Sequence, residues 1–404
     1  MKANEKFTEN KRYVITLLRQ NGKLTKRQLT SMGNMGWATV VKMINQLLEE
    51  GIVVSCGISE SEKSKVGKHA ISYTLADNYP LAIGIDNELR TTRIVLVNLL
   101  GEILAEEKYE TPQTIEIEDS CKFLEVSIKD FIRKNSIDWE VVKGIGIGKS
   151  GISFPSIYYP GHINTSLKQR EYLMSVFHKE VKIETNTRVY SVFEQWISEN
   201  FNYNDFFFVQ IRKGVGTGII TNGALYSGTH GLSGEISHIK VIQNGLPCRC
   251  GSVGCMETVV NEFFLYEQYR MLILKDNNWA DGSNDEVLRN GLSDLFTRAK
   301  RGEEAALNIV KAAAGYLGYS ISMAIIVLDI PNIIVSGYFG PDGDVIEKFI
   351  EDEIKKQILP KMPFSVHYVP LEPDGFVQGA ALLILKDYLY NVPHEGIADD
   401  FQGK

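Results

Sequence analysis

The chain has 404 residues, 44% of them hydrophobic and 23% charged, which is enough apolar material for two or three globular domains. Its formal charge of −7, taken as a whole, argues against binding to nucleic acid. The charge is unevenly distributed, because residues 1–78 hold twelve Lys and Arg against seven Asp and Glu, or +5, which leaves −12 on residues 79–404. A basic arm on an acidic body indicates a nucleic-acid or membrane role for the arm.

The sequence argues against a secreted or membrane-spanning protein. The first twelve residues are polar and lack the apolar core of a signal peptide. No unbroken run approaches the roughly 20 apolar residues that cross a bilayer. We therefore expect a soluble, cytoplasmic protein with no membrane partner.

Residues 1–78 predict helices closed by a hairpin. A first helix should end at Asn21, and Thr25 with Gln28 forms a capping-box pattern that starts a second helix. After the glycines of 31–36, a third, amphipathic helix is predicted over 37–50. Its apolar face is predicted to consist of Val40, Ile44, Leu47 and Leu48. Two helices joined by a short turn with glycine are typical of a helix-turn-helix.

A basic wing is predicted after these helices. The β-prone runs 51–54 and 70–75 flank the charged stretch 59–69, so we expect a winged helix-turn-helix that binds operator DNA as a dimer. The alternative is a small helical protein-interaction module. The residues expected at the major groove are Trp37, Ala38, Thr39, Val41 and Lys42, and those expected near phosphates are Lys26, Arg27, Lys68 and His69.

From residue 81 onward the pattern is α/β. Apolar strand candidates alternate with segments long enough for helices, and two similar lobes fit the pattern. The strand candidates are 81–85, 94–97, 144–147, 206–211 and 333–335.

Four soft or borderline ligands gather in one short segment. The ligand set of a closed Cys3His zinc site is present in His238, Cys248, Cys250 and Cys255. Two glycines between the cysteines allow the chain to form a tight knuckle. A closed site keeps no open position for catalysis, so we expect a structural Zn2+. The alternative is a set of buried free thiols.

The segment 234–257, with its pattern GExxH followed by CxCGxxGCxE, resembles the signature of the ROK family (repressors, open reading frames and kinases). The resemblance covers essentially the whole chain, and the winged helix is similar to the repressor branch of xylose-type and N-acetylglucosamine-type regulators. It implies a two-lobed actin-like, sugar-kinase-like (ribonuclease H-like) body. The implied domains are 1–78 for DNA binding, 79–187 completed by 375–395 for lobe 1, and 188–374 for lobe 2 with the knuckle.

The resemblance also exposes departures from the family's kinases. Asp86 is followed by Asn87-Glu88 instead of two glycines, and the second phosphate loop begins Arg212-Lys213-Gly214 instead of GTG. Asn186 stands at the position of the catalytic Asp, and an amide cannot accept the proton of a sugar hydroxyl. We therefore expect no catalytic residue and no kinase activity.

Sugar recognition looks better preserved. By resemblance, carboxylates and one metal-bound imidazole would bind sugar hydroxyls, helped by polar residues of the first lobe. The implied sugar-binding residues are Glu235, His238, Glu257, Asn186, Thr185, Gly151 and Asn164. The alternative is that Glu235 and Glu257 are ordinary surface carboxylates.

These features predict a transcriptional regulator, most simply a repressor of carbohydrate-utilisation genes, whose effector is a sugar or sugar phosphate. It would act as a homodimer or homotetramer. Two rivals remain open: a ROK sugar kinase with an appended DNA-binding domain, and a DNA-binding protein that has lost its ligand.

Overall fold

The structure is a computed structural model of the chain, and it divides into two compact units. Unit 1 comprises residues 1–201 and 376–404, and unit 2 comprises 202–375. The structure describes residues 2–58, 70–88, 90–112, 116–149, 165–197, 204–276 and 284–390. The boundary between the units lies at residue 202 instead of the predicted 188, because helix α6 (Asn186–Ile197) belongs to unit 1. The helix packs closely there, since a Cβ on Gly379 of unit 1 would lie 2.0 Å from the carbonyl oxygen of Val189 in α6.

Three helices and a small sheet begin unit 1. The elements are α1 (Lys2–Asn21), β1 (Leu24–Thr25), α2 (Lys26–Gly33), α3 (Trp37–Glu49), β2 (Val53–Ile58) and β3 (Ile71–Leu75), and the sheet order is β1-β3-β2. The capping box is confirmed, because the Thr25 hydroxyl accepts from the Gln28 backbone N–H and the Gln28 side chain accepts from the Thr25 N–H. Ile15, Leu29 and Ile44 are fully buried between the helices.

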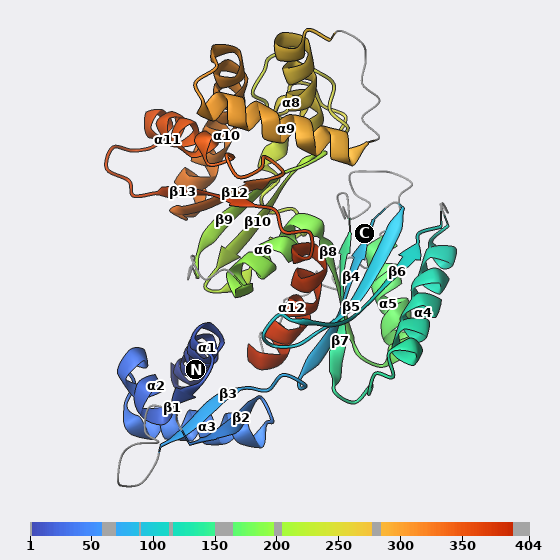
Figure 1. Cartoon of the computed structure of the whole chain (residues 1–404), viewed down its shortest axis with the longest axis vertical. Coiled ribbons are helices and arrows are strands. Elements are labelled where there is room, and N and C mark those ends of the chain that lie inside the picture. Colours follow the sequence, from blue (N-terminus) through green and yellow to red (C-terminus); the bar gives the residue numbers. More distant parts are fainter. Residues whose placement is uncertain are drawn as a thin grey trace, which may run out of the picture. The chain divides into compact units, whose positions relative to one another are not determined.

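A five-stranded sheet forms the rest of unit 1. Its strands are β4 (Leu81–Asn87), β5 (Thr91–Val97), β6 (Ile103–Glu110), β7 (Val142–Lys149) and β8 (Glu180–Thr185), in the order β6-β5-β4-β7-β8. Helices α4 (Ile117–Lys134) and α5 (Thr165–Phe177) pack on one face, and α12 (Gly375–Tyr390) lies on the other with α6 (Figure 1). The pair β4–β5 and the pair β5–β6 are antiparallel, whereas β7 and β8 continue the sheet in parallel.

Unit 2 repeats this topology. Strands β9 (Phe206–Ile211), β10 (Val215–Thr221), β11 (Ala224–Leu225), β12 (Asn332–Gly337) and β13 (Ser365–Pro370) follow the order β11-β10-β9-β12-β13, again antiparallel for the first three and parallel for the last two. The helical elements are η2 (Ile236–His238), α7 (Glu257–Val260), α8 (Glu262–Tyr269), the π-helical turn η3 (Arg270–Leu274), α9 (Asp285–Lys300), α10 (Glu304–Leu328) and α11 (Val345–Gln357). The strand candidates predicted in both units are therefore confirmed.

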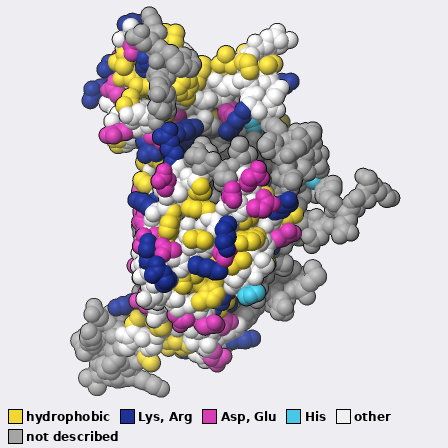
Figure 2. Space-filling model, turned by 90° about the vertical axis from the view of Figure 1, so that its right-hand side faces the viewer, with side chains coloured by type: hydrophobic (Ala, Val, Ile, Leu, Met, Phe, Trp, Pro, Cys, Tyr) yellow, Lys and Arg dark blue, Asp and Glu magenta, His cyan; other side chains and the backbone are white. Residues whose placement is uncertain are grey.

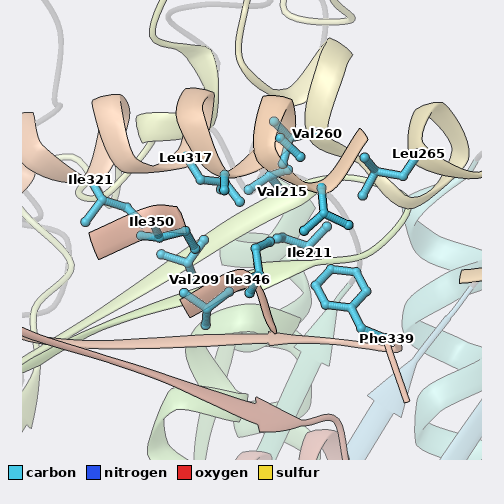
Figure 3. Packing of buried hydrophobic residues seen from close by; sticks show 14 of the residues in the cluster. Val209, Ile211, Val215, Val260, Leu265, Leu317, Ile321, Phe339, Ile346 and Ile350 are labelled. Carbon is cyan, nitrogen blue, oxygen red and sulfur yellow. The ribbon is translucent and has the colours of Figure 1, made fainter. Parts of the chain in front are cut away.

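The core of unit 2 forms between the sheet and the helices. Figure 3 shows Val209 and Ile211 of β9 pointing toward Leu317 of α10 and Ile350 of α11. Phe207, in the predicted buried strand, is 1% exposed in the same cluster. Non-directional burial of this kind is the main favourable contribution to folding.

Helix α10 is long and apolar enough, by length and composition alone, to cross a membrane. It contains no long unbroken apolar run, because polar Asn308 and charged Lys311 interrupt its apolar residues. More than half of its most apolar window is buried, and Ile309, Leu317 and Ile321 belong to the core of unit 2. The hydrophobicity of α10 is therefore explained by its position in the core of unit 2.

The surface over α4 carries charges of both signs. Figure 2 shows Lys and Arg side chains interspersed with Asp and Glu over the middle of the visible face. Along α4, Asp130 forms ion pairs with Arg133 at 2.6 Å and Lys134 at 2.9 Å. Such exposed pairs contribute little to stability.

We predict that Gly146→Ala destabilises the protein. A Cβ at this position of β7 would lie 1.8 Å from the Ala380 carbonyl oxygen of α12, so the helix must move away from the sheet. Overpacking of this kind costs about 1–3 kcal/mol of unfolding free energy, measured by urea or thermal unfolding. The control is Gly315→Ala in α10, whose Cβ would meet nothing within 4 Å and should raise stability by up to about 1 kcal/mol. Equal stability of the two variants would contradict the close packing of α12.

Candidate functional site

The four predicted metal ligands lie together in unit 2. One ligand atom from each of His238, Cys248, Cys250 and Cys255 lies within 4.8 Å of the others. The Cys250 and Cys255 sulfurs are 3.7 Å apart, and the Cys248 sulfur is 3.5 Å from His238 Nδ1. A tetrahedral ion with bonds of about 2.3 Å to sulfur and about 2.0 Å to nitrogen requires separations of about 3.8 and 3.5 Å. The group therefore has the spacing of a metal site.

Short backbone hydrogen bonds build the knuckle that holds these ligands. The Cys248 N–H donates to the Ser252 carbonyl at 2.8 Å, and residues 240 and 255 form an isolated β-bridge. The two predicted glycines are required by the backbone, since Gly251 and Gly254 have φ of +86° and +75°. A Cβ on Gly254 would also lie 1.8 Å from the Ile242 carbonyl oxygen.

The imidazole of His238 has two different neighbours. Its Nδ1 faces the sulfurs, while its Nε2 lies 3.8 Å from a Glu235 carboxylate oxygen. Burial lowers the pKa of His238, which favours the neutral form that ligates metals. Glu235 is therefore placed to orient the ring from its far side, as a carboxylate behind a metal-bound histidine does.

Glu257, the other predicted sugar-binding carboxylate, holds a guanidinium group. Arg249 lies between two of the cysteines and binds Glu257 through two nitrogens, at 3.0 and 3.1 Å. The Val215 N–H also donates to Glu257 at 3.3 Å. Glu257 is 6% exposed, so it is not an ordinary surface carboxylate. The sequence analysis does not predict Arg249 as the partner of Glu257. Its position between Cys248 and Cys250 nevertheless places it beside the predicted metal ligands.

The first-lobe positions meet at one edge of the sheet in unit 1. Asp86 pairs in register with Gly148 on the neighbouring strand, and Thr185 pairs with Lys149. Asn186 follows at once as the first residue of α6, and a Cβ on Gly148 would lie 2.8 Å from its Oδ1. Strand ends of this kind commonly line ligand sites in α/β proteins. The predicted residues Gly151 and Asn164 lie outside the described residues.

The predicted DNA-facing residues lie on the outer face of α2 and α3. Trp37 is 57% exposed, Ala38 and Lys42 are exposed, and Thr39 and Val41 are half-buried. Arg27 is exposed, while Lys26 donates to Asn45 Oδ1 at 3.0 Å, which links the two helices. The predicted wing residues Lys68 and His69 lie outside the described residues.

A cationic junction that the sequence did not predict lies between α1 and the body of unit 1. The Arg19 guanidinium lies 4.5 Å from the Trp196 ring, and that of Arg12 lies 4.9 Å from the Tyr390 ring. Lys386 of α12 is buried beside them and donates to the Gln195 side chain. Burial, together with the charges of Arg12 and Arg19, lowers the pKa of Lys386 to about 7.

Comparison with known proteins agrees with these features. A model described as "ROK family" matches residues 82–387. The chain is 25% identical to the DNA-binding transcriptional dual regulator NagC of Escherichia coli (strain K12) over 386 residues, 95% of this chain and 93% of that protein. It is 26% identical to a glucokinase of Halalkalibacterium halodurans over 316 residues, 75% of this chain and 94% of the glucokinase.

A solved structure shares the fold over almost the full length. It is a ROK family transcriptional regulator described as a homolog of the E. coli MLC protein. The two chains superpose with a TM-score of 0.72 at 21% identity, covering 96% of this chain and 97% of that one. The body of this chain therefore has the α/β architecture shared by ROK regulators and ROK sugar kinases.

We predict that Cys250→Ser lowers both metal content and stability. The variant leaves three of four ligands, and a structural site of this kind contributes on the order of 10 kcal/mol to folding at neutral pH. Mass spectrometry of the gel-filtered protein would give the metal-to-protein ratio, and thermal unfolding the midpoint. Cys56→Ser, outside the cluster, is the control and should change neither. Equal metal content in the two variants would show that the four residues do not form the site.

Proposed function

Because the chain belongs to the ROK family, we propose that it is a DNA-binding transcriptional repressor whose effector is a sugar or sugar phosphate. The observation that carries the proposal is the N-terminal domain. The family match begins only at residue 82, and a glucokinase aligned over 94% of its own length leaves a quarter of this chain uncovered. The regulator NagC, in contrast, aligns over 95% of this chain.

The shape of the N-terminal domain supports DNA binding. Helices α2 and α3 are joined by the three residues 34–36, and α3 is followed by the hairpin β2–β3. This arrangement supports the proposal of a winged helix-turn-helix, in which α3 would enter the major groove of the DNA and α2 would lie near the phosphate backbone. Trp37, Thr39 and Lys42 would reach the bases, and Arg27 the phosphates. One such domain reads few base pairs, so we propose a homodimer or homotetramer in the cytoplasm.

The carboxylates near the metal ligands support effector binding. Glu235 and Glu257 accept hydrogen bonds only, so they suit the hydroxyl donors of a sugar. Glu257 already accepts from a backbone N–H and a guanidinium, which fixes its orientation. We propose that sugar hydroxyls replace Arg249 as its partner. Thr185, Asn186, Gly151 and Asn164 are proposed as further contacts.

The donor set supports Zn2+ as the metal. Three sulfurs and one imidazole nitrogen at tetrahedral spacing suit zinc, and four protein ligands leave no open position for a catalytic water. The role proposed for the ion is structural: it would hold the knuckle so that His238 and Arg249 keep their positions.

A sugar kinase with an appended DNA-binding domain is the main rival, and three residues argue against it. Asn186 stands where the kinases of the family carry their catalytic Asp, and its amide cannot remove a proton. Arg212 and Lys213 occupy a loop that in the kinases is small and glycine-rich. Loss of a positioned base alone costs roughly 10²- to 10⁴-fold in rate. A coupled assay for ADP release with a panel of hexoses separates the two activities.

We predict that Glu257→Gln keeps operator binding and loses the response to effector. Losing a hydrogen bond to a charged group costs about 1.5–3 kcal/mol, or roughly 10- to 150-fold in effector affinity. Fluorescence anisotropy of a DNA fragment selected from a random library would be measured with and without pentoses, hexoses, N-acetylamino sugars and their phosphates. Glu286→Gln, on the exposed side of α9, is the control and should respond like the native protein. A normal response in Glu257→Gln would exclude this carboxylate from the site.

We predict that operator affinity falls with salt and that Arg27→Ala reduces the slope. Each phosphate neutralised contributes about 0.9 to the slope of log affinity against log salt, so removing one contact should lower the slope by about 1. Lys348→Ala, an exposed lysine of α11, is the matched loss of charge and should leave the slope unchanged. Equal slopes for Arg27→Ala and the native protein would show that α2 does not contact the backbone.

A further inference from the structure

Helix α6 runs from the proposed effector residues to the contact with the N-terminal helices. It begins at Asn186, directly after Thr185, and its last turn carries Gln195 and Trp196. With a rise of about 1.5 Å per residue, Asn186 and Trp196 lie about 15 Å apart along the helix axis. One helix of unit 1 therefore starts at the sheet edge where effector contacts are proposed and ends against α1.

The body of unit 1 encloses α6 along almost its whole length. Every residue from Asn186 to Glu194 is buried, and so is Trp196. The helix contains neither glycine nor proline, the residues that commonly kink a helix. The Trp196 Nε1–H donates to the Leu99 carbonyl at 2.9 Å, which holds the end of the helix against the turn between β5 and β6. Such a helix is expected to shift as a whole, because no flexible position would absorb a displacement of one end.

Helix α12 is joined to α6 by close packing. A Cβ on Gly379 would lie 2.0 Å from the Val189 carbonyl oxygen, so the two backbones are in contact. The Tyr190 and Phe376 rings, one from each helix, have centroids 4.9 Å apart. Because protein interiors are close-packed, a displacement of α6 is expected to displace α12 as well. We call these two helices the α6–α12 pair.

Both helices of the α6–α12 pair contact α1 at the end away from Asn186. The Arg19 guanidinium lies 4.5 Å from the Trp196 ring centroid of α6, and the Arg12 guanidinium lies 4.9 Å from the Tyr390 ring centroid of α12. The Trp196 and Tyr390 rings are themselves neighbours, with centroids 6.3 Å apart. Guanidinium groups are attracted to aromatic faces and stack on them, so α1 is bound to the end of the pair.

We propose that the α6–α12 pair transmits effector binding to the DNA-binding domain, and that Arg19 is the positioning residue that makes α1 follow the pair. An effector bound at Thr185 and Asn186 displaces the start of α6, and the Trp196 ring moves α1 with it. This proposal rests on the proposed function, which supplies the effector residues and the DNA-binding domain. The effector must bind the two arrangements with different affinity, and such couplings typically change affinity about 5- to 150-fold.

A wedge at the start of α6 tests the transmission without any sugar. A Cβ on Gly148 would lie 2.8 Å from Asn186 Oδ1 and 3.1 Å from Val189 Cγ2, so Gly148→Ala pushes the start of the helix away from the sheet. In fluorescence anisotropy with an operator selected from a random library, the wedge should change affinity about fivefold or more. In an Arg19→Met background it should change affinity less than about twofold, because α1 no longer follows Trp196.

The comparison of the two backgrounds separates transmission from ordinary destabilisation. Substitutions more than about 10 Å apart normally act independently, so a wedge that merely loosens the fold changes operator affinity equally in both. Lys11→Met is the matched control, because this cation of α1 pairs with Glu50 inside the N-terminal domain at 2.7 Å. The wedge should keep its full effect beside Lys11→Met. Equal effects in the native and Arg19→Met backgrounds, or no effect in the native protein, would overturn the proposal.

Hydrogen exchange of the α1 backbone amides gives a readout that needs neither DNA nor sugar. The wedge should change their exchange rates about threefold or more in the native background and leave them unchanged beside Arg19→Met. This pattern without operator binding supports transmission and contradicts the regulator function. Normal operator binding with equal wedge effects in both backgrounds contradicts transmission and leaves the regulator function standing.

Thermal unfolding verifies that each variant is folded. If Gly148→Ala does not fold, Asn186→Ser takes its place, since it opens a gap at the same contact instead of overfilling it. The same two outcomes then decide: an effect that requires Arg19 supports the proposal, and an effect independent of Arg19 overturns it.

Discussion

The close approach of α12 to β4 and β7 organises the whole of unit 1. Cβ atoms on Gly84 and Gly146 would lie 2.1 and 1.8 Å from carbonyl oxygens of Val377 and Ala380, so only glycine allows this contact. The packing joins a helix from the end of the chain to the first strands of the sheet. It also fixes the direction of α12, whose last turn, with Lys386, reaches the N-terminal helices. Helix α1 therefore packs against the last turn of a helix that lies far from it in the sequence.

The junction at that surface brings cationic side chains against aromatic rings. Arg12 and Arg19 keep weakly hydrated, planar guanidiniums stacked on Tyr390 and Trp196. Burial lowers the pKa of Arg19, and burial together with the charges of Arg12 and Arg19 lowers the pKa of Lys386 to about 7. Contacts between guanidinium groups and aromatic rings therefore join α1 to the body of unit 1.

Local chemistry was predictable from the sequence, and long-range partners were not. The capping box at Thr25 and the ligand spacing of Cys248 depend on neighbours within about ten residues, so pattern reasoning found them. The sequence also predicts the third helix, but its predicted buried face differs from the observed one. Leu48, predicted to be buried, is half-buried, and Met43 is buried in addition, because a periodic pattern fixes a helix face only to within one residue. The contact of Arg12 in α1 with Tyr390 in α12 joins residues more than 350 positions apart, and no local pattern encodes it.

Glu257 can still bind a ligand although it already pairs with Arg249. The Arg249 side chain is 59% exposed, so water screens the pair and its net contribution is on the order of 1 kcal/mol. The hydrogen bond from the Val215 N–H comes from the backbone of β10 and does not depend on Arg249. A sugar hydroxyl that displaces the guanidinium therefore meets an acceptor already oriented by the sheet. Because Arg249 lies between two of the predicted metal ligands, Cys248 and Cys250, a sugar that displaces it from Glu257 would act on the segment proposed to hold the metal.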